Sequence, residues 1–168
     1  MSINEIIDQL VSSIRQETEL YRLMLTTIDK EKDAAIRSDL NSLNETEIEK
    51  ENLLAKLHRV EEQRCLLVTK LSETLAYPYQ SLTLTRISQM VVEPFAGRLE
   101  KASTDLKTTL NALREASRGN QLLFEHSLEL LRGSFNLLSG LMGANKVYYR
   151  TGGIRSIAPA GKCVCSEI

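Results

Sequence analysis

The residues that most often carry metal or nucleophilic chemistry are few and scattered in this sequence. His58 and His126 lie far apart, and neither has a cluster of cysteines or histidines beside it. His58 and Cys65 are seven positions apart and would share one face of a helix, but two ligands do not make a zinc site. The remaining pair, Cys163 and Cys165, is expected to stay reduced in a cytosolic protein. We therefore expect no metal ion and no cofactor.

Familiar catalytic motifs are also missing from the sequence. There is no P-loop, no GxGxxG after a strand, no GxSxG and no HExxH. Acidic residues are spread over the chain without standing out as a catalytic pair. The last four residues match a prenylation box only superficially, because Ser166 and Glu167 occupy positions that should be aliphatic. The sequence predicts a protein that is not an enzyme.

Charge and composition exclude two further classes of function. A net charge of -1 over 168 residues gives no electrostatic footprint for nucleic acid or an anionic membrane. No stretch approaches the roughly 20 apolar residues of a membrane span. The first residues, MSINEIIDQL, include acidic side chains and lack the basic region and cleavage site of a secretory signal. We therefore expect a cytoplasmic protein without nucleic-acid binding or membrane insertion.

The helices that must position any functional residue are read from the spacing of apolar residues. The first predicted helix covers residues 3–37, where spacings of four and three alternate as in a heptad seam, with Glu17 as the one polar residue on it. Ser2 and Glu5 have the spacing of a capping box at its start. The seam is formed by Ile3, Ile7, Leu10, Ile14, Tyr21, Met24 and Ile28.

A second helix is predicted over residues 40–76. It follows a break at Ser38-Asp39, two residue types that favour the N-cap. Tyr77-Pro78-Tyr79 ends it, because the residue before a proline is disfavoured in the α region. We expect residues 82–93 to form a short helix across the end of the bundle, although their first four residues would also suit a brief extended stretch. Pro94 either starts the next helix or kinks a continuous one.

The last and longest helix starts at Phe95 and contains the most apolar stretch of the chain, residues 120–149. On a helix, this stretch places large apolar residues on two neighbouring lines: Leu123, Leu130 and Leu137 on one, and Phe124, Leu131, Leu138 and Leu141 on the other. Its apolar surface is wider than the roughly 100° stripe of a helix that packs on one side of a bundle. Either the stretch is buried on several sides, or part of it is left for a partner.

The end of this helix is predicted near Gly143-Ala144-Asn145, a reasonable helix terminator. Tyr148-Tyr149 either anchors a partner or packs on the bundle as a last helical turn; the sequence does not decide between these two interpretations. After Tyr149 the periodicity ends, and adjacent glycines and a proline predict a disordered tail over residues 150–168.

Several groups of residues in these predicted helices follow a familiar order. They are DLNSL at 39–43, EKENLL at 49–54 with Leu57, VEEQR at 60–64, NQLL at 120–123, Ser127-Leu128, NLL at 136–138, Tyr148-Tyr149 and Gly152. Over roughly residues 5–153, this order resembles the FlgN-type flagellar type III export chaperone family. The resemblance implies a non-catalytic chaperone of the bacterial cytoplasm. Such a chaperone binds the C-terminal helical segments of hook-associated (hook–filament junction) proteins and delivers them to the type III export apparatus.

The resemblance further implies that residues 120–149 belong to the substrate-binding region. A substrate helix lying in a hydrophobic groove needs apolar anchors at i, i+3, i+4 and i+7. The candidate partner-binding residues are Leu130, Leu131, Phe135, Leu138, Leu141, Met142, Tyr148 and Tyr149. Because Ser127 and Ser134 alternate with larger residues, we also expect two faces: a narrower one that packs inward, and one around Phe135 and Met142 that is left for the partner.

The predicted fold is all-α: an elongated antiparallel bundle of three long helices plus a short connecting helix, followed by a disordered C-terminal tail. Residues 1–149 would form the helical domain and residues 150–168 a flexible tail. Two other functions remain open. One is a homo-oligomeric coiled-coil scaffold or adaptor without a dedicated export substrate. The other is an enzyme or metal sensor acting through His58, Cys65 and the two cysteines of the tail.

Overall fold

The structure of the protein is a computed structural model that describes residues 2–143, 146–148 and 154–156, with the side chains of residues 2–140. The chain divides into two compact units, Met1–Leu122 and Leu123–Ile168. Each unit is described by itself.

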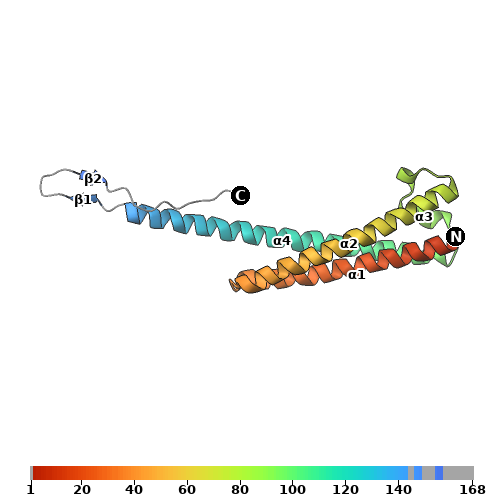
Figure 1. Cartoon of the computed structure of the whole chain (residues 1–168), viewed down its shortest axis with the longest axis horizontal. Coiled ribbons are helices and arrows are strands. Elements are labelled where there is room, and N and C mark those ends of the chain that lie inside the picture. The colour runs from red at the N-terminus through yellow and green to blue at the C-terminus, as the bar shows by residue number, and fades with distance from the viewer. Residues whose placement is uncertain (1, 144–145, 149–153, 157–168) are drawn as a thin grey trace. The chain divides into compact units, whose positions relative to one another are not determined.

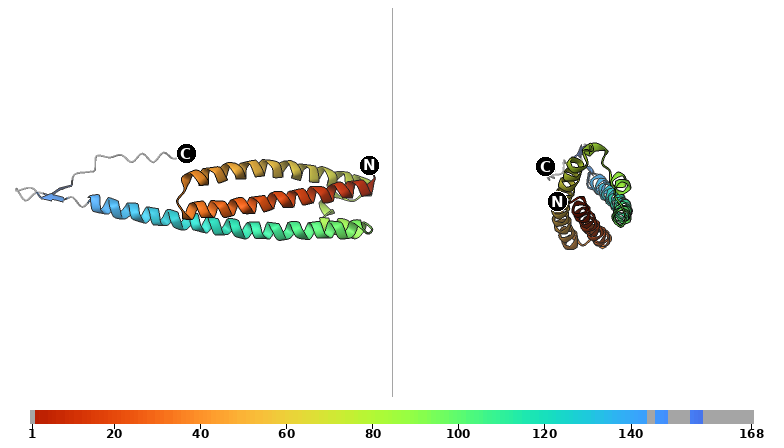
Figure 2. Two further views of the ribbon diagram at one scale, coloured as in Figure 1. Left: turned by 90° about the horizontal axis from the view of Figure 1, so that it is seen from below. Right: turned by 90° about the vertical axis from the view of Figure 1, so that its right-hand side faces the viewer.

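The first unit is built on an antiparallel pair of long helices, α1 (Ile3–Ile36) and α2 (Leu40–Leu75), which lie side by side (Figures 1 and 2). The predicted capping box starts α1: the Glu5 backbone amide donates to Ser2 Oγ at 3.3 Å, and the Ser2 amide donates to Glu5 Oε2 at 2.9 Å. These two bonds satisfy backbone donors that the first helical turn leaves unpaired.

A tight turn joins α1 to α2 at the predicted break. Ser38 has a φ of 56°, in the left-handed region, and reverses the chain. Asp39 then caps α2, because its carboxylate accepts hydrogen bonds from the Ser42 backbone amide at 3.1 Å and from Ser42 Oγ at 2.7 Å. The predicted boundary between the two helices is confirmed.

The far end of α2 stops at Ala76, whose φ of 50° is also left-handed. The chain then forms a short 3-10 helix, η1 (Tyr79–Ser81), and the helix α3 (Leu84–Met90), which Thr83 caps. Residues 82–93 thus contain the short helix that the sequence predicted instead of an extended stretch. Ile87 of α3 is fully buried in the core between the helix ends.

The helix α4 (Phe95–Gly143) begins directly after Pro94, whose carbonyl accepts the Arg98 amide at 3.4 Å. The proline therefore precedes the helix and does not kink it. The residues of α4 up to 122 complete the first unit as its third long helix (Figure 2). The helices of this unit enclose two cores. The larger one is formed by Ile6, Ile7, Leu10, Val11, Ile14, Leu67, Val68, Leu71, Leu82, Ile87, Leu99, Ala102 and Leu106. The smaller one is formed by Met24, Ile28, Leu53 and Leu57.

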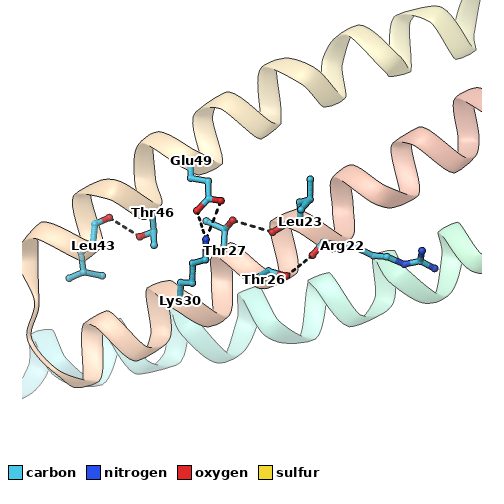
Figure 3. A network of polar contacts seen from close by, with 8 residues as sticks. All are labelled: Arg22, Leu23, Thr26, Thr27, Lys30, Leu43, Thr46 and Glu49. Carbon is cyan, nitrogen blue, oxygen red and sulfur yellow. Dashed lines mark hydrogen bonds and ion pairs between the residues drawn. The ribbon is translucent and has the colours of Figure 1, made fainter.

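Polar residues between α1 and α2 are paired within the bundle. Figure 3 shows Lys30 Nζ 3.0 Å from Glu49 Oε2 across the two helices. The buried hydroxyls of Thr27 and Thr46 donate to the Leu23 and Leu43 carbonyls of their own helices, at 3.1 and 2.7 Å. No buried side-chain nitrogen or oxygen in the described part of the chain lacks a partner.

The second unit holds the rest of α4 and two short strands. Strand β1 (Lys146–Tyr148) pairs antiparallel with β2 (Ile154–Ser156), with Val147 opposite Arg155. The all-α bundle of three long helices and a short connecting helix is confirmed, but this hairpin was not predicted. Tyr148 lies in β1 and is not part of a last helical turn. The predicted domain boundary at residue 149 stays a prediction, because residues 149–153 lie outside the described ones.

Candidate protein-binding surface

Most of the described apolar residues of α4 beyond Asn120 are exposed. Four of the predicted partner-binding residues lie in this segment, with exposed fractions of 71% for Leu130, 56% for Leu131, 67% for Phe135 and 55% for Leu138. We call residues 123–143 of α4 the distal segment. Leu122, Leu128 and Leu137 add to the exposed apolar area.

The remaining predicted partner-binding residues are only partly covered by the structure. Leu141 and Met142 belong to α4, but their side chains lie outside the described ones. Tyr148 belongs to β1, and Tyr149 is not among the described residues. The structure thus places six of the eight candidates on one helix, four of them with described side chains.

The expectation that one face of this segment packs inward is wrong for its described side chains. Leu123 and Phe124 are half-buried, and every side chain from Glu125 to Gly140 is exposed. Asn120 is the last buried residue of α4, at 5% exposure. The physical reason is that both cores of the first unit take their α4 residues from positions 95–116, so neither core extends to the distal segment. Both faces of the distal segment are therefore left uncovered.

The hydroxyl groups of two serines on the distal segment donate hydrogen bonds to backbone carbonyls of their own helix. Ser127 Oγ donates to the Leu123 carbonyl and Ser134 Oγ to the Leu130 carbonyl, each at 2.9 Å. A hydroxyl that is bonded to its own helix does not need a partner from outside. An apolar molecule can therefore cover these serines without leaving a buried polar group unpaired.

A polar network marks the last buried turn of α4. Asn120 Nδ2 donates to the Ile28 carbonyl at 2.8 Å and to Glu31 Oε2 at 3.1 Å. Glu31 in turn accepts from Lys50 Nζ at 2.8 Å, in an ion pair whose side chains are largely shielded from solvent. The network joins α1, α2 and α4 of the first unit and fixes the register of α4 against the other two helices.

A second polar contact lies in the middle of the α1–α2 pair. Glu17 is only 4% exposed, and Arg64 Nε donates to its Oε2 at 3.0 Å. Burial raises the pKa of the Glu17 carboxyl above its ordinary value, and the nearby Arg64 guanidinium opposes that rise without overcoming it. The sequence identified Glu17 as the polar residue on the seam, but gave no signal that Arg64 is its partner.

The residues considered for metal or catalytic chemistry are not brought together. His58 is exposed and lies 3.3 Å from Glu62 of its own helix, while Cys65 is a half-buried free thiol. No group of three or more potential metal ligands occurs among the described residues. The two cysteines of the tail are not among them. Of the described helices, none is both long and apolar enough to cross a membrane.

The first unit also has open hollows on its surface, some of them lined by carboxylates such as Glu100 and Asp105. One open groove of about 340 Å³ between α1 and α2 is lined by amides, hydroxyls, leucines and one lysine: Gln9, Ser12, Ser13, Gln16, Gln63, Leu66, Leu67 and Lys70. It contains no carboxylate or histidine to act as a general base. We take the distal segment of α4, with its exposed large apolar side chains, as the candidate surface for binding another molecule.

Comparison with known proteins found a match to a protein family. The family described as FlgN protein matches residues 1–156, which span the bundle, the distal segment and both strands. No curated protein and no solved structure matches the chain. Because the family match covers most of the sequence, the chain belongs to the FlgN protein family.

Proposed function

We propose that this protein is a non-catalytic chaperone of the bacterial cytoplasm that binds the C-terminal helical segments of hook-associated flagellar proteins and delivers them to the type III export apparatus. Membership of the FlgN family carries the general role, that of a flagellar export chaperone that binds flagellar proteins. The observation that supports the finer proposal is the exposed apolar surface of the distal segment.

The energetics of this surface favour binding of an apolar helix. Contiguous exposed apolar patches on soluble proteins mark interaction sites, and burying one large apolar side chain contributes about 1.5–3 kcal/mol. Leu131, Phe135 and Leu138 are spaced four and three residues apart along α4. This spacing suits an amphipathic helix lying along α4. Covering the terminal helix of a subunit in this way would keep it from assembling before export.

The proposal is tested by placing charge on the surface without touching the bundle. Phe135→Asp with Leu138→Asp should abolish binding of a purified hook-associated protein, measured by titration calorimetry. Both side chains are exposed and outside the two cores, so circular dichroism should show an unchanged helical bundle. Leu54→Asp with Leu66→Asp is the matched control, since these leucines of α2 are 57% and 62% exposed. Retained binding by the folded distal variant would contradict the proposal.

The same surface could instead close a homo-oligomer, as expected for a coiled-coil scaffold. Light scattering of the purified chain separates the two functions. A stable dimer that the Phe135→Asp, Leu138→Asp variant converts to a monomer, together with no affinity for a hook-associated protein, would favour the scaffold over the chaperone.

A further inference from the structure

The apolar pattern of α4 changes at Asn120. Within the bundle one heptad seam is buried, formed by Leu99, Ala102, Leu106, Thr109, Leu113, Ala116 and Asn120 at spacings of three and four, with Leu113 and Ala116 half-buried. Most positions of the neighbouring seam are polar and exposed there, as at Lys107, Arg114 and Gln121, and Leu110 is its one large apolar residue, half-buried against the core. In the first unit, α4 is therefore apolar mainly on one seam.

Beyond Asn120 the helix has two apolar seams instead of one. The first seam continues the line of Lys107, Arg114 and Gln121, but its residues here are large and apolar: Phe124, Leu128, Leu131, Phe135, Leu138 and Met142. The second seam continues the buried seam of the bundle in the same register: Leu123, Ser127, Leu130, Ser134, Leu137 and Leu141. Each heptad seam of this kind receives the side chains of a neighbouring helix.

The second seam indicates what kind of molecule covers it. Its continuation within the bundle packs against helices α1 and α2, so the established interface of this line of α4 is helical. The small, internally bonded Ser127 and Ser134 let a helix approach closely and bury no unsatisfied hydroxyl. An extended peptide would bring unpaired backbone groups onto a surface that offers them no partner.

The opposite side of the distal segment limits how many helices can bind. Helical geometry places Glu125, Glu129, Arg132 and Asn136 on one side, away from both seams. These residues are exposed and charged or polar. Two neighbouring helices are enough to cover both apolar seams. A third helix would have to pack against the charged and polar side chains on the opposite side of α4.

We propose that the distal segment binds two helical segments of one flagellar export substrate, one on each seam, and not a single amphipathic helix. The proposal rests on the proposed chaperone function and specifies the structure of its substrate. Binding two helices at once would double the apolar contact available on this short stretch of α4. It also explains why the segment is apolar over far more than the stripe that one neighbour requires.

Site-specific cross-linking tests the number of helices directly. A photoreactive phenylalanine derivative is placed in the full chain at Phe135 on the first seam or at Leu130 on the second, with Leu54 of α2 as the control position. Each chain is irradiated with a purified hook-associated protein, and the linked peptides are identified by mass spectrometry. We expect the two seams to capture two different helical segments of the substrate. Capture of one shared segment from both positions, or of a second copy of this chain, overturns the inference.

Single substitutions separate failure of this inference from failure of the chaperone function. Phe135→Asp and Leu130→Asp should each raise the Kd for the hook-associated protein by about tenfold or more, because each removes an anchor from an occupied seam. If only one of them weakens binding, a single helix is bound; the inference is then wrong while the proposed function stands. If the unmodified chain shows no binding at all, the proposed function fails and the inference fails with it.

Discussion

At the scale of single residues, the bundle depends on a few buried polar contacts whose partners are distant in sequence. The sequence marked Glu17 as a polar residue on an apolar seam, yet its partner Arg64 is 47 positions away on another helix. Periodicity describes one helix at a time and carries no information on which helices meet. Asn120 likewise donates to a backbone carbonyl 92 positions away, a partner that the sequence does not indicate.

Replacing Glu17 with glutamine should stabilise the protein at neutral pH but not in acid. Because burial raises the pKa of this carboxyl above 4.5, the folded chain holds the proton more tightly than the unfolded chain. The stability that the protonated form provides is complete below pH 4.5 and is lost as the pH rises through the folded pKa. The difference in melting temperature between variant and parent should therefore start near zero in acid and grow with pH.

Thermal unfolding over a range of pH checks this expectation, with Glu45→Gln as the control because Glu45 is an exposed carboxylate of α2. A Glu17→Gln variant that loses stability at neutral pH would show that the attraction of Arg64 outweighs the cost of burial.

The side-chain amide of Asn120 should contribute measurably to the free energy of unfolding. Asn120→Ala removes the donor to the Ile28 carbonyl and to Glu31, so we expect the free energy of unfolding to fall by about 1–2 kcal/mol. Urea unfolding measures this change. Asn111→Ala, at an exposed position of the same helix, introduces the same gain in helix propensity without losing a buried bond. Equal stabilities of the two variants would contradict a role for the Asn120 network.

At the scale of elements, signals within a few residues predicted the helices well. Features that depend on contacts between distant segments were missed. The capping box of Ser2 and the N-cap of Asp39 involve residues three positions apart, so the sequence contains everything needed to find them. The strand that includes Tyr148 was missed because it forms by pairing with Ile154–Ser156, in a stretch whose adjacent glycines and proline predicted a disordered tail. The exposure of the distal segment could not be predicted either, since the periodicity of a helix does not show which of its side chains other helices cover.

Gly133 offers a test of how the distal segment is supported. A Cβ at this position would meet nothing within 4 Å. Gly133→Ala should therefore stabilise this part of α4 by about 1 kcal/mol, the difference in helix propensity between the two residues. Amide hydrogen exchange of neighbouring residues should slow accordingly. Gly97→Ala is the matched control, because its Cβ would lie 3.3 Å from Glu93 Oε2 and should gain less. Faster exchange in Gly133→Ala would mean that the segment packs more closely than its exposure indicates.

At the scale of the whole molecule, the two cores and the proposed binding surface lie in different parts of the chain. Both cores lie within Met1–Leu122, while no described side chain of the distal segment is buried. A chain ending at Leu122 should therefore unfold cooperatively at nearly the same temperature as the full protein, and should not bind a hook-associated protein. Calorimetric melting and titration of the two chains make the comparison. A truncated chain that fails to fold would show that the bundle needs its C-terminal third.

The exposure of the distal segment also has a consequence for how long the protein survives in a cell. A helix that buries no described side chain opens at a low free energy, and proteases cut such segments first. A bound substrate lowers the population of the open form in proportion to its concentration relative to Kd. Occupied molecules would then outlast empty ones, so the amount of this chaperone would follow the supply of its cargo.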